Sequence, residues 1–207
     1  MNSKQYFNKI AGDWDSMRET FFSIEVREQA ISVAGIQSKA VVADIGAGSG
    51  FITEGLVNKV LKIIAVDQSE KMLERMQEKF YKYKNIYYRL SGAERLPIAD
   101  GEVDIAFANM YLHHVEDPPA AIKEMVRILK PGGRIVITDA DKHDYEFLRT
   151  EQHDRWLGFD RDDIKKWFEN TNLKNIKVDC VGTNCCPTAQ SSGERAVITI
   201  FYAVGEK

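Results

Sequence analysis

Three glycines, at positions 46, 48 and 50, are the residues of this chain best suited to holding a ligand. They follow an apolar run, Val41 to Ile45, that contains one acidic residue, Asp44. Glycine adopts positive φ without strain, and because it has no Cβ a bound molecule can approach its backbone. A helix that begins near Gly50 would direct free N–H groups at that molecule. The pattern therefore predicts a strand, a tight turn and a helix start that together hold a cofactor.

The spacing of these glycines and the charge of Asp44 indicate which cofactor is held. The spacing is Gly-x-Gly-x-Gly, whereas a dinucleotide-binding strand is followed by Gly-x-Gly-x-x-Gly. A carboxylate at the mouth of the strand would repel a pyrophosphate but would attract an ammonium or a sulfonium. We therefore expect S-adenosyl-L-methionine, with S-adenosyl-L-homocysteine as its product, rather than the nicotinamide cofactor of a dehydrogenase.

A second carboxylate, Asp67, ends the apolar run Lys62 to Val66. A carboxylate at the tip of the second strand can accept hydrogen bonds from both hydroxyls of a ribose, as in nucleotide-binding sheets generally. The alternative is that Asp67 caps the helix that begins near Ser69. We predict ribose binding, and the sequence leaves the capping role open.

His113 and His114 are the candidate catalytic residues. Adjacent histidines are expected to lean in opposite directions, so that at most one would act, and a packing role is the alternative for each. Methyl transfer from a sulfonium can be accelerated by aligning donor and acceptor and by excluding water. A general base is needed only where the acceptor must lose a proton of high pKa.

The three cysteines gather late in the chain, as Cys180, Cys185 and Cys186. The pattern is not a disulfide framework, and its spacing is not that of a structural zinc site. Cys180 is expected to be a small core residue. We predict no metal site, although a thiolate pair in a polar loop is a soft donor set that His143 or His153 could supplement.

Strand-like and helix-like segments alternate along the middle of the chain, and the strand runs are continuously apolar. This pattern predicts an α/β, Rossmann-like, doubly wound fold with helices on both faces of a mostly parallel sheet. Seven strands are expected, with the last one antiparallel. The expected strands cover 40–45, 62–66, 85–90, 103–108, 133–138, 174–182 and 194–204. The expected helices cover 2–18, 24–35, 50–59, 70–82, 119–129 and 160–170.

In an open parallel sheet the ligand lies beyond the carboxyl ends of the strands, where the strand order reverses. Residues at those ends are candidates before any family is considered. They are Asp44 to Gly50, Asp67 with Gln68, Ala93 with Glu94, Asn109 with Met110, and Asp139. An exposed turn position is the alternative for Glu94, because Gly92 and Pro97 flank it.

Six segments resemble, in order, those of class I S-adenosylmethionine-dependent methyltransferases of type 11. This group includes ubiquinone/menaquinone biosynthesis methyltransferases and arsenite methyltransferases. The segments are Tyr6–Asp15, Asp44–Gly50, Gly92–Pro97, Val103–Phe107, Leu112–Val115 and Arg127–Gly133. They cover roughly residues 5 to 140 and are specific for the cofactor and the fold, but not for the substrate.

The resemblance assigns roles to individual positions. It implies that Gly46 and Gly48 contact the methionine part of the cofactor, that Asp67 holds the ribose, and that Asn109 offers its backbone near the sulfonium. The remaining expected cofactor residues are Gln68 and Met72 at the adenine face, Ala93 and Glu94 at its edge, Tyr6 and Trp14 in an N-terminal lid, Asp44, Ala47 and Gly50 around the turn, and Met110 beside Asn109.

Composition restricts the partners. Lys and Arg total 28 against 31 for Asp and Glu, which gives a net charge of −3. The sequence has no block of basic residues of the kind that binds nucleic acid, so we expect no nucleic-acid partner. No run has the roughly 18 apolar residues of a membrane span, and no signal peptide is evident, so a cytoplasmic monomer or homodimer is expected. We predict one domain over 1–207, with a helical lid at 1–36 and a substrate-side insertion at 139–172.

The sequence thus predicts a methyltransferase that acts on a small molecule by in-line displacement. Two alternatives stay open. One is a metalloid or thiol methyltransferase that uses the loop of Cys185 and Cys186. The other is a module that binds the cofactor without catalysis, since a fold does not guarantee chemistry.

Overall fold

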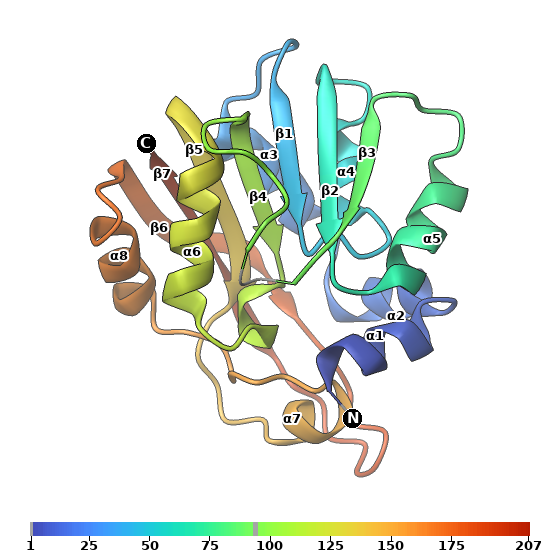
Figure 1. The fold of residues 1–207 in the computed structure, drawn as a ribbon. Helices are drawn as coiled ribbons and strands as arrows, with labels where there is room; N and C mark the ends of the chain where they lie inside the picture. The colour runs from blue at the N-terminus through green and yellow to red at the C-terminus, as the bar shows by residue number, and fades with distance from the viewer. Residues whose placement is uncertain (1, 93–94) are drawn as a thin grey trace.

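A seven-stranded sheet forms the centre of the molecule, in a computed structural model that describes residues 2–92 and 95–207 (Figure 1). The strand order is β3-β2-β1-β4-β5-β7-β6. All neighbouring pairs from β3 to β5 are parallel, whereas β7 runs antiparallel to both β5 and β6. The strands are β1 (Val41–Ile45), β2 (Lys62–Asp67), β3 (Ile86–Leu90), β4 (Val103–Asn109), β5 (Leu129–Ala140), β6 (Lys174–Cys185) and β7 (Ile198–Glu206). The predicted fold class is confirmed, including the antiparallel last strand.

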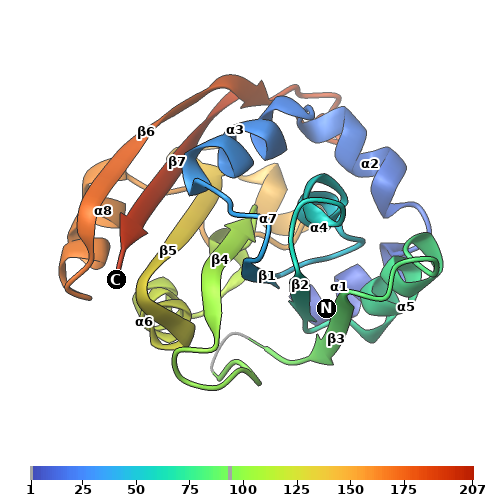
Figure 2. The ribbon, with the colours of Figure 1, turned by 90° about the horizontal axis from the view of Figure 1, so that it is seen from above.

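Helices cover both faces of the sheet, as Figure 2 shows from above. On one face lie α3 (Glu25–Ala34), α4 (Phe51–Leu56) and α5 (Glu70–Lys79), and on the other lie α6 (Pro118–Ile128) and α8 (Arg161–Glu169). Alternate strand residues enter the two cores, so that Ile63 packs on the first face and Ile64 on the second. Because both faces are covered, the strand sequences are continuously apolar rather than alternating.

Strand register brings the expected site residues to one edge of the sheet. Ile45, the last residue of β1, pairs with Val66 of β2 and with Ala108 of β4. The glycine turn, Asp67 and Asn109 follow these three positions directly. Their convergence is therefore set by the pairing of β1 with its two neighbours.

The N-terminal segment differs from the expected single helix over 2–18. It forms two helices, α1 (Ser3–Ile10) and α2 (Trp14–Phe21), which are separated by a turn at residues 11–13. Gly12 lies in this turn, and glycine is the poorest helix former after proline. The third helix, α3, packs against the sheet, so that only α1 and α2 of the expected lid at 1–36 lie over the cavity described below.

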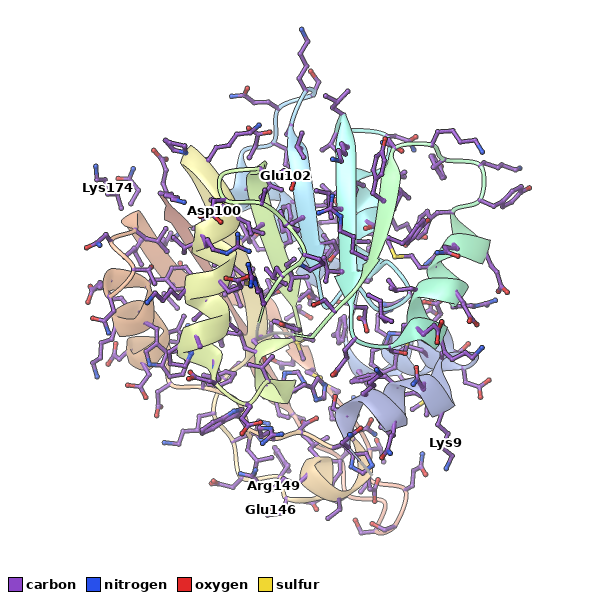
Figure 3. All side chains as sticks on the ribbon, in the orientation of Figure 1. Lys9, Asp100, Glu102, Glu146, Arg149 and Lys174 are labelled. Carbon is purple, nitrogen blue, oxygen red and sulfur yellow. The ribbon has the colours of Figure 1, made fainter. Side chains whose placement is uncertain are left out.

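The C-terminal part adds a short helix, α7 (Phe147–Glu151), and the hairpin of β6 and β7. Strand β6 continues to Cys185, three residues beyond its expected end. Charged side chains such as Lys9, Glu146 and Lys174 lie at the periphery of the fold (Figure 3). In the parts of the chain that the structure describes, no helix combines the length and apolar character needed to cross a bilayer.

Candidate active site

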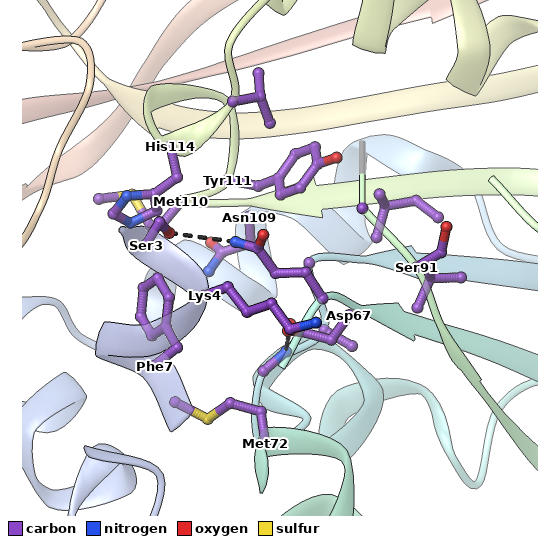
Figure 4. A pocket seen from close by; sticks show the side chains of 18 of the residues that line it. Ser3, Lys4, Phe7, Asp67, Met72, Ser91, Asn109, Met110, Tyr111 and His114 are labelled. Atoms are coloured by element: carbon purple, nitrogen blue, oxygen red, sulfur yellow. Dashed lines mark hydrogen bonds between the residues drawn. The ribbon is translucent and has the colours of Figure 1, made fainter. Parts of the chain in front are cut away.

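A cavity of about 820 Å³ opens at the carboxyl ends of β1, β2 and β4. It lies where β1 is flanked by β2 on one side and by β4 on the other, which is the switch point of the sheet. Side chains from α1, from the sheet edge and from the segment after β4 surround it (Figure 4). Its volume is within the range of about 300–1,000 Å³ that is typical of small-molecule sites.

The glycine turn forms the floor of this cavity. Gly46 and Gly48 line it with φ angles of +67° and +54°, and Ala47 lies between them. A Cβ on Gly46 would collide with the ring of Tyr111, so the close approach itself requires glycine. Gly50 is not among the lining residues, because it packs against Phe80 and Met76 behind the turn.

Asp44 lies behind the cavity wall rather than at its surface. Its side chain is 2% exposed, and its Oδ2 accepts hydrogen bonds from the backbone N–H and the hydroxyl of Thr53, at 3.1 and 2.7 Å. Burial raises the pKa of Asp44 to about 6, despite these two hydrogen bonds. Asp44 therefore ties the start of α4 to β1. The sequence predicted that this carboxylate attracts a sulfonium at the mouth of the strand, but the structure places it behind the residues that line the cavity.

Asp67 lines the cavity and joins its two loops. One carboxylate oxygen accepts the N–H of Gly48 at 2.8 Å, and the other accepts the N–H of Ser69 at 2.8 Å. A carboxylate offers about four acceptor positions, so acceptor capacity stays available for a hydroxyl donor. The N-cap of α5 is Ser69 rather than Asp67, because the Ser69 hydroxyl accepts the N–H of Met72. Asp67 thus braces the turn while keeping acceptor capacity toward the cavity.

The other expected residues divide between the cavity and its surroundings. Trp14, Gln68, Met72, Asn109 and Met110 line the cavity. Tyr6 is buried beside it and lines a smaller cavity instead. Ala93 and Glu94 lie outside the described residues.

Sequence reasoning missed Tyr111 and Phe7, which both line the cavity. Tyr111 follows Met110 directly, so extending the strand-end rule by one residue would have found it. Phe7 packs edge-on against Trp14, with ring centroids 5.3 Å apart. No spacing signal in the sequence separates Phe7, as a cavity residue, from its neighbours on α1.

Polar contacts tie α1 and α2 to the rim of the cavity. The Asn8 side-chain oxygen accepts the Ser69 hydroxyl at 2.7 Å, and the Asp15 carboxylate accepts the Ser49 hydroxyl at 2.5 Å. Gln68 donates to the hydroxyl of Ser3 at 3.2 Å. These contacts hold the two helices at the rim of the cavity.

Asn8→Ala is expected to speed dissociation of S-adenosylmethionine by about 2- to 10-fold. The substitution removes the hydrogen bond from the Ser69 hydroxyl at 2.7 Å and a long one from the Lys71 N–H at 3.4 Å, and a neutral hydrogen bond contributes about 0.5–1.5 kcal/mol. Stopped-flow displacement of the bound cofactor measures the rate. Lys9→Ala, at the exposed neighbouring position on α1, is the control, and equal rates for the two variants would contradict this role of Asn8.

The strands that build this cavity also match a known family of domains. Residues 43–137 match the family model described as a methyltransferase domain, type 11. Over this range the chain is similar to methyltransferase domains of type 11. The matched range runs from β1 to β5 and contains the glycine turn, Asp67 and Asn109, so it covers most of the cavity floor.

Two curated relatives are named for methyl transfer to different acceptors. The ubiquinone/menaquinone biosynthesis C-methyltransferase of Pseudoalteromonas translucida is 30% identical over 151 residues, which cover 69% of this chain and 60% of the relative. The malonyl-[acyl-carrier protein] O-methyltransferase of a Marinomonas species is 31% identical over 136 residues, covering 64% and 49%. The chain therefore spans three fifths or less of the length of these relatives.

A solved structure gives the same fold. Phosphoethanolamine N-methyltransferase 2 of Haemonchus contortus, in complex with S-adenosyl-L-methionine, superposes with a TM-score of 0.71 at 15% identity. The match covers 87% of this chain and 52% of the other. The predicted recognition of a class I methyltransferase domain is confirmed by the family match, and its Rossmann-like architecture by this superposition.

His113 and His114 lie close together and both approach Asp154. They belong to a short 3₁₀ helix, η1 (Leu112–His114), and their ring centroids are 4.1 Å apart. The expectation that they lean in opposite directions is wrong, because the tight helical turn brings both rings to the same side. His114 lines the large cavity, whereas His113 lines only the smaller one beside it.

His113 is held by Asp139, at the end of β5. The His113 Nδ1 and Asp139 Oδ1 atoms are 2.6 Å apart, and both residues are buried. Burial lowers the pKa of His113, but the charges of Asp139 and Asp154 outweigh it and raise the pKa to about 9. Without another cation nearby, His113 therefore carries a proton at neutral pH.

The cysteines are distributed differently from the prediction. Cys185 ends β6 and is 7% exposed, rather than lying in a polar loop, and it lines the small cavity with His143. Burial raises the pKa of the Cys185 thiol. Cys180 is half-buried on the edge strand β6 rather than in the core. Cys186 and His153 do not line the small cavity, so the four weak metal candidates do not form one cluster.

Proposed function

We propose that the chain is an S-adenosylmethionine-dependent methyltransferase that transfers a methyl group to a small-molecule acceptor by in-line displacement. The observation that supports this most is the cavity at the switch point. There the positive-φ turn of Gly46 and Gly48 adjoins the Asp67 carboxylate, which has unused acceptor capacity. The cavity therefore offers a glycine cradle and a ribose acceptor side by side.

The residues present fit this cofactor. Asp67 would accept the ribose hydroxyls, Met72 would pack on the adenine, and the turn at Gly46 would admit the methionine part. S-adenosylmethionine supplies an already activated methyl group, so no strong base is required of the protein. The chain must instead orient the two reactants and keep water away.

Aromatic side chains are placed to exclude water. Phe7 and Trp14 come from the lid, and Tyr111 comes from the segment after β4, and all three line the cavity. The His114 ring packs edge-on against Phe7, with centroids 5.0 Å apart. An acceptor beside these groups would be enclosed when the lid is held down.

The substrate class is tested by measuring release of S-adenosylhomocysteine with a panel of phenols, amines, thiols and arsenite. We expect turnover with at least one small acceptor and none with protein or nucleic acid. Binding of the cofactor without turnover on any acceptor class would instead support the non-catalytic module.

We also propose that the chain is cytoplasmic, in keeping with its three free cysteines, and that it is a monomer or a homodimer.

A metalloid or thiol methyltransferase remains the second candidate, because Cys185 lines a cavity adjoining the cofactor site. Cys185→Ser is expected to leave the affinity for S-adenosylmethionine unchanged, within about 2-fold, since Cys185 does not line the larger cavity. Calorimetric titration of the cofactor measures this, and a large loss of affinity would contradict the placement. Loss of arsenite-dependent cofactor consumption in the same variant would favour this second candidate.

A further inference from the structure

Three donor atoms converge beside the cofactor cavity. They are His113 Nε2, His114 Nδ1 and one carboxylate oxygen of Asp154, and all lie within 4.8 Å of one another. Each imidazole nitrogen is 3.8 Å from the same oxygen, Asp154 Oδ1. These separations are too long for hydrogen bonds, so the three groups face one another without bonding directly.

His114 provides an observation that is independent of this clustering. Its Nδ1 is buried and has no hydrogen-bond partner among the described residues. A buried polar atom left without a partner costs about 1–3 kcal/mol, so such atoms call for an explanation. The Asp154 carboxylate lies 3.8 Å from this nitrogen and can only accept hydrogen bonds when ionised. A cation between the two would satisfy both.

His113 is arranged as histidine ligands of metals usually are. Its Nδ1 lies 2.6 Å from Asp139, which leaves Nε2 directed toward Asp154. Asp139 is itself fixed, because it accepts the N–H groups of Leu112 and Ala140 at 2.9 and 2.8 Å. A carboxylate behind the ligating imidazole sets its tautomer and orientation in most metal sites.

We propose that His113, His114 and Asp154 form a binding site for a divalent transition metal of the zinc class. Two imidazoles and one carboxylate are the ligand set of many catalytic zinc centres, which keep a further position open. Zinc bonds of about 2.0–2.1 Å in a tetrahedron require donor separations of about 3.4 Å. The two nitrogen-to-carboxylate separations of 3.8 Å need only a small contraction, and the two nitrogens, which lie within 4.8 Å of each other, must approach as well.

The surroundings leave room for a further ligand. A cavity of about 60 Å³ adjoins the three residues, and Cys185 and His143 also line it. That volume can hold a water molecule. Because His114 lines the large cavity as well, a metal held here would lie close to the expected position of the methyl acceptor. The proposal rests on these residues alone and does not depend on the proposed methyl transfer.

The test is titration of tag-free protein, freed of metal by a chelator, with Zn²⁺ in a calorimeter and with Co²⁺ in a visible spectrometer. We expect one Zn²⁺ per chain and the intense visible absorption of low-coordinate Co²⁺. His114→Ala and Asp154→Asn should each weaken binding by at least about 100-fold, and Asp139→Asn by about 10- to 100-fold. His153→Ala, which removes a histidine outside the cluster, should change it less than about 3-fold.

Two results would overturn the site. One is the absence of stoichiometric Zn²⁺ binding to the unaltered chain, which would leave the cluster as a network held by the proton of His113. The other is equal weakening by His153→Ala and by the cluster variants. Circular dichroism checks that the variants fold. If neither cluster variant folds, the Co²⁺ spectrum of the unaltered chain tests the proposed ligands. Intense visible absorption would support them, and weak absorption typical of octahedral Co²⁺ would contradict them.

Discussion

Gly46→Ala is expected to reduce the affinity for S-adenosylmethionine by at least about 100-fold, equivalent to about 2.8 kcal/mol. Two effects combine. An L-residue in the left-handed region costs about 1–2 kcal/mol, so at the φ of +67° found for Gly46 an alanine drives the free turn toward other conformations, which cofactor binding must then reverse. In addition, the new methyl group would collide with the ring of Tyr111 and push it toward the space that the cofactor needs. Isothermal titration calorimetry measures the change.

Gly132→Ala is the matched control for backbone strain. Gly132 has a φ of +76°, but a Cβ there would meet nothing within 4 Å, and it lies away from the cavity. This variant should lose a similar amount of stability from strain and keep its cofactor affinity. Equal affinity losses in both variants would show that general destabilisation, rather than the cradle at Gly46, is responsible.

Asp67→Asn is expected to produce the second large effect, a loss of cofactor affinity of about 10- to 100-fold. The carboxylate accepts the N–H groups of Gly48 and Ser69, and an amide can accept at only one of its two ends. One buried N–H is left without a partner, at a cost of about 1–3 kcal/mol, and the ribose loses a charged acceptor. Calorimetry with adenosine as well as S-adenosylmethionine measures both losses.

Asp104→Asn serves as the control for Asp67→Asn. The Asp104 carboxylate also accepts a backbone N–H, that of Val41 at 2.7 Å, and it lies near the opposite ends of the strands. It should destabilise the fold without changing cofactor affinity. Should Asp67→Asn bind adenosine and S-adenosylmethionine as tightly as the unaltered chain does, the ribose assignment would be wrong.

The fold could be predicted well from the sequence, because buried parallel strands leave a strong local signal. Continuous apolar runs such as Ile63 to Val66 are recognisable without a partner. Strand-end geometry then brought Gly46, Asp67 and Asn109 together correctly, since parallel strands share one carboxyl edge.

Long-range contacts account for what the sequence could not predict. Asp44 belongs to a buried layer because Thr53 covers it, and no spacing rule encodes that contact. Asp154 reaches His113 and His114 from a loop roughly 40 residues later in the chain, so the cluster emerges only in three dimensions. Cys185 is buried because β6 extends further than its apolar pattern suggests.

The cavity beyond β1 and β2 is expected to hold a sulfonium nucleoside. The decisive measurement is calorimetric titration of the purified chain with S-adenosylmethionine, S-adenosylhomocysteine and NAD. We predict that the first two bind with one molecule per chain and that NAD does not bind. Binding of NAD, with neither S-adenosylmethionine nor S-adenosylhomocysteine bound, would contradict the assignment of the site.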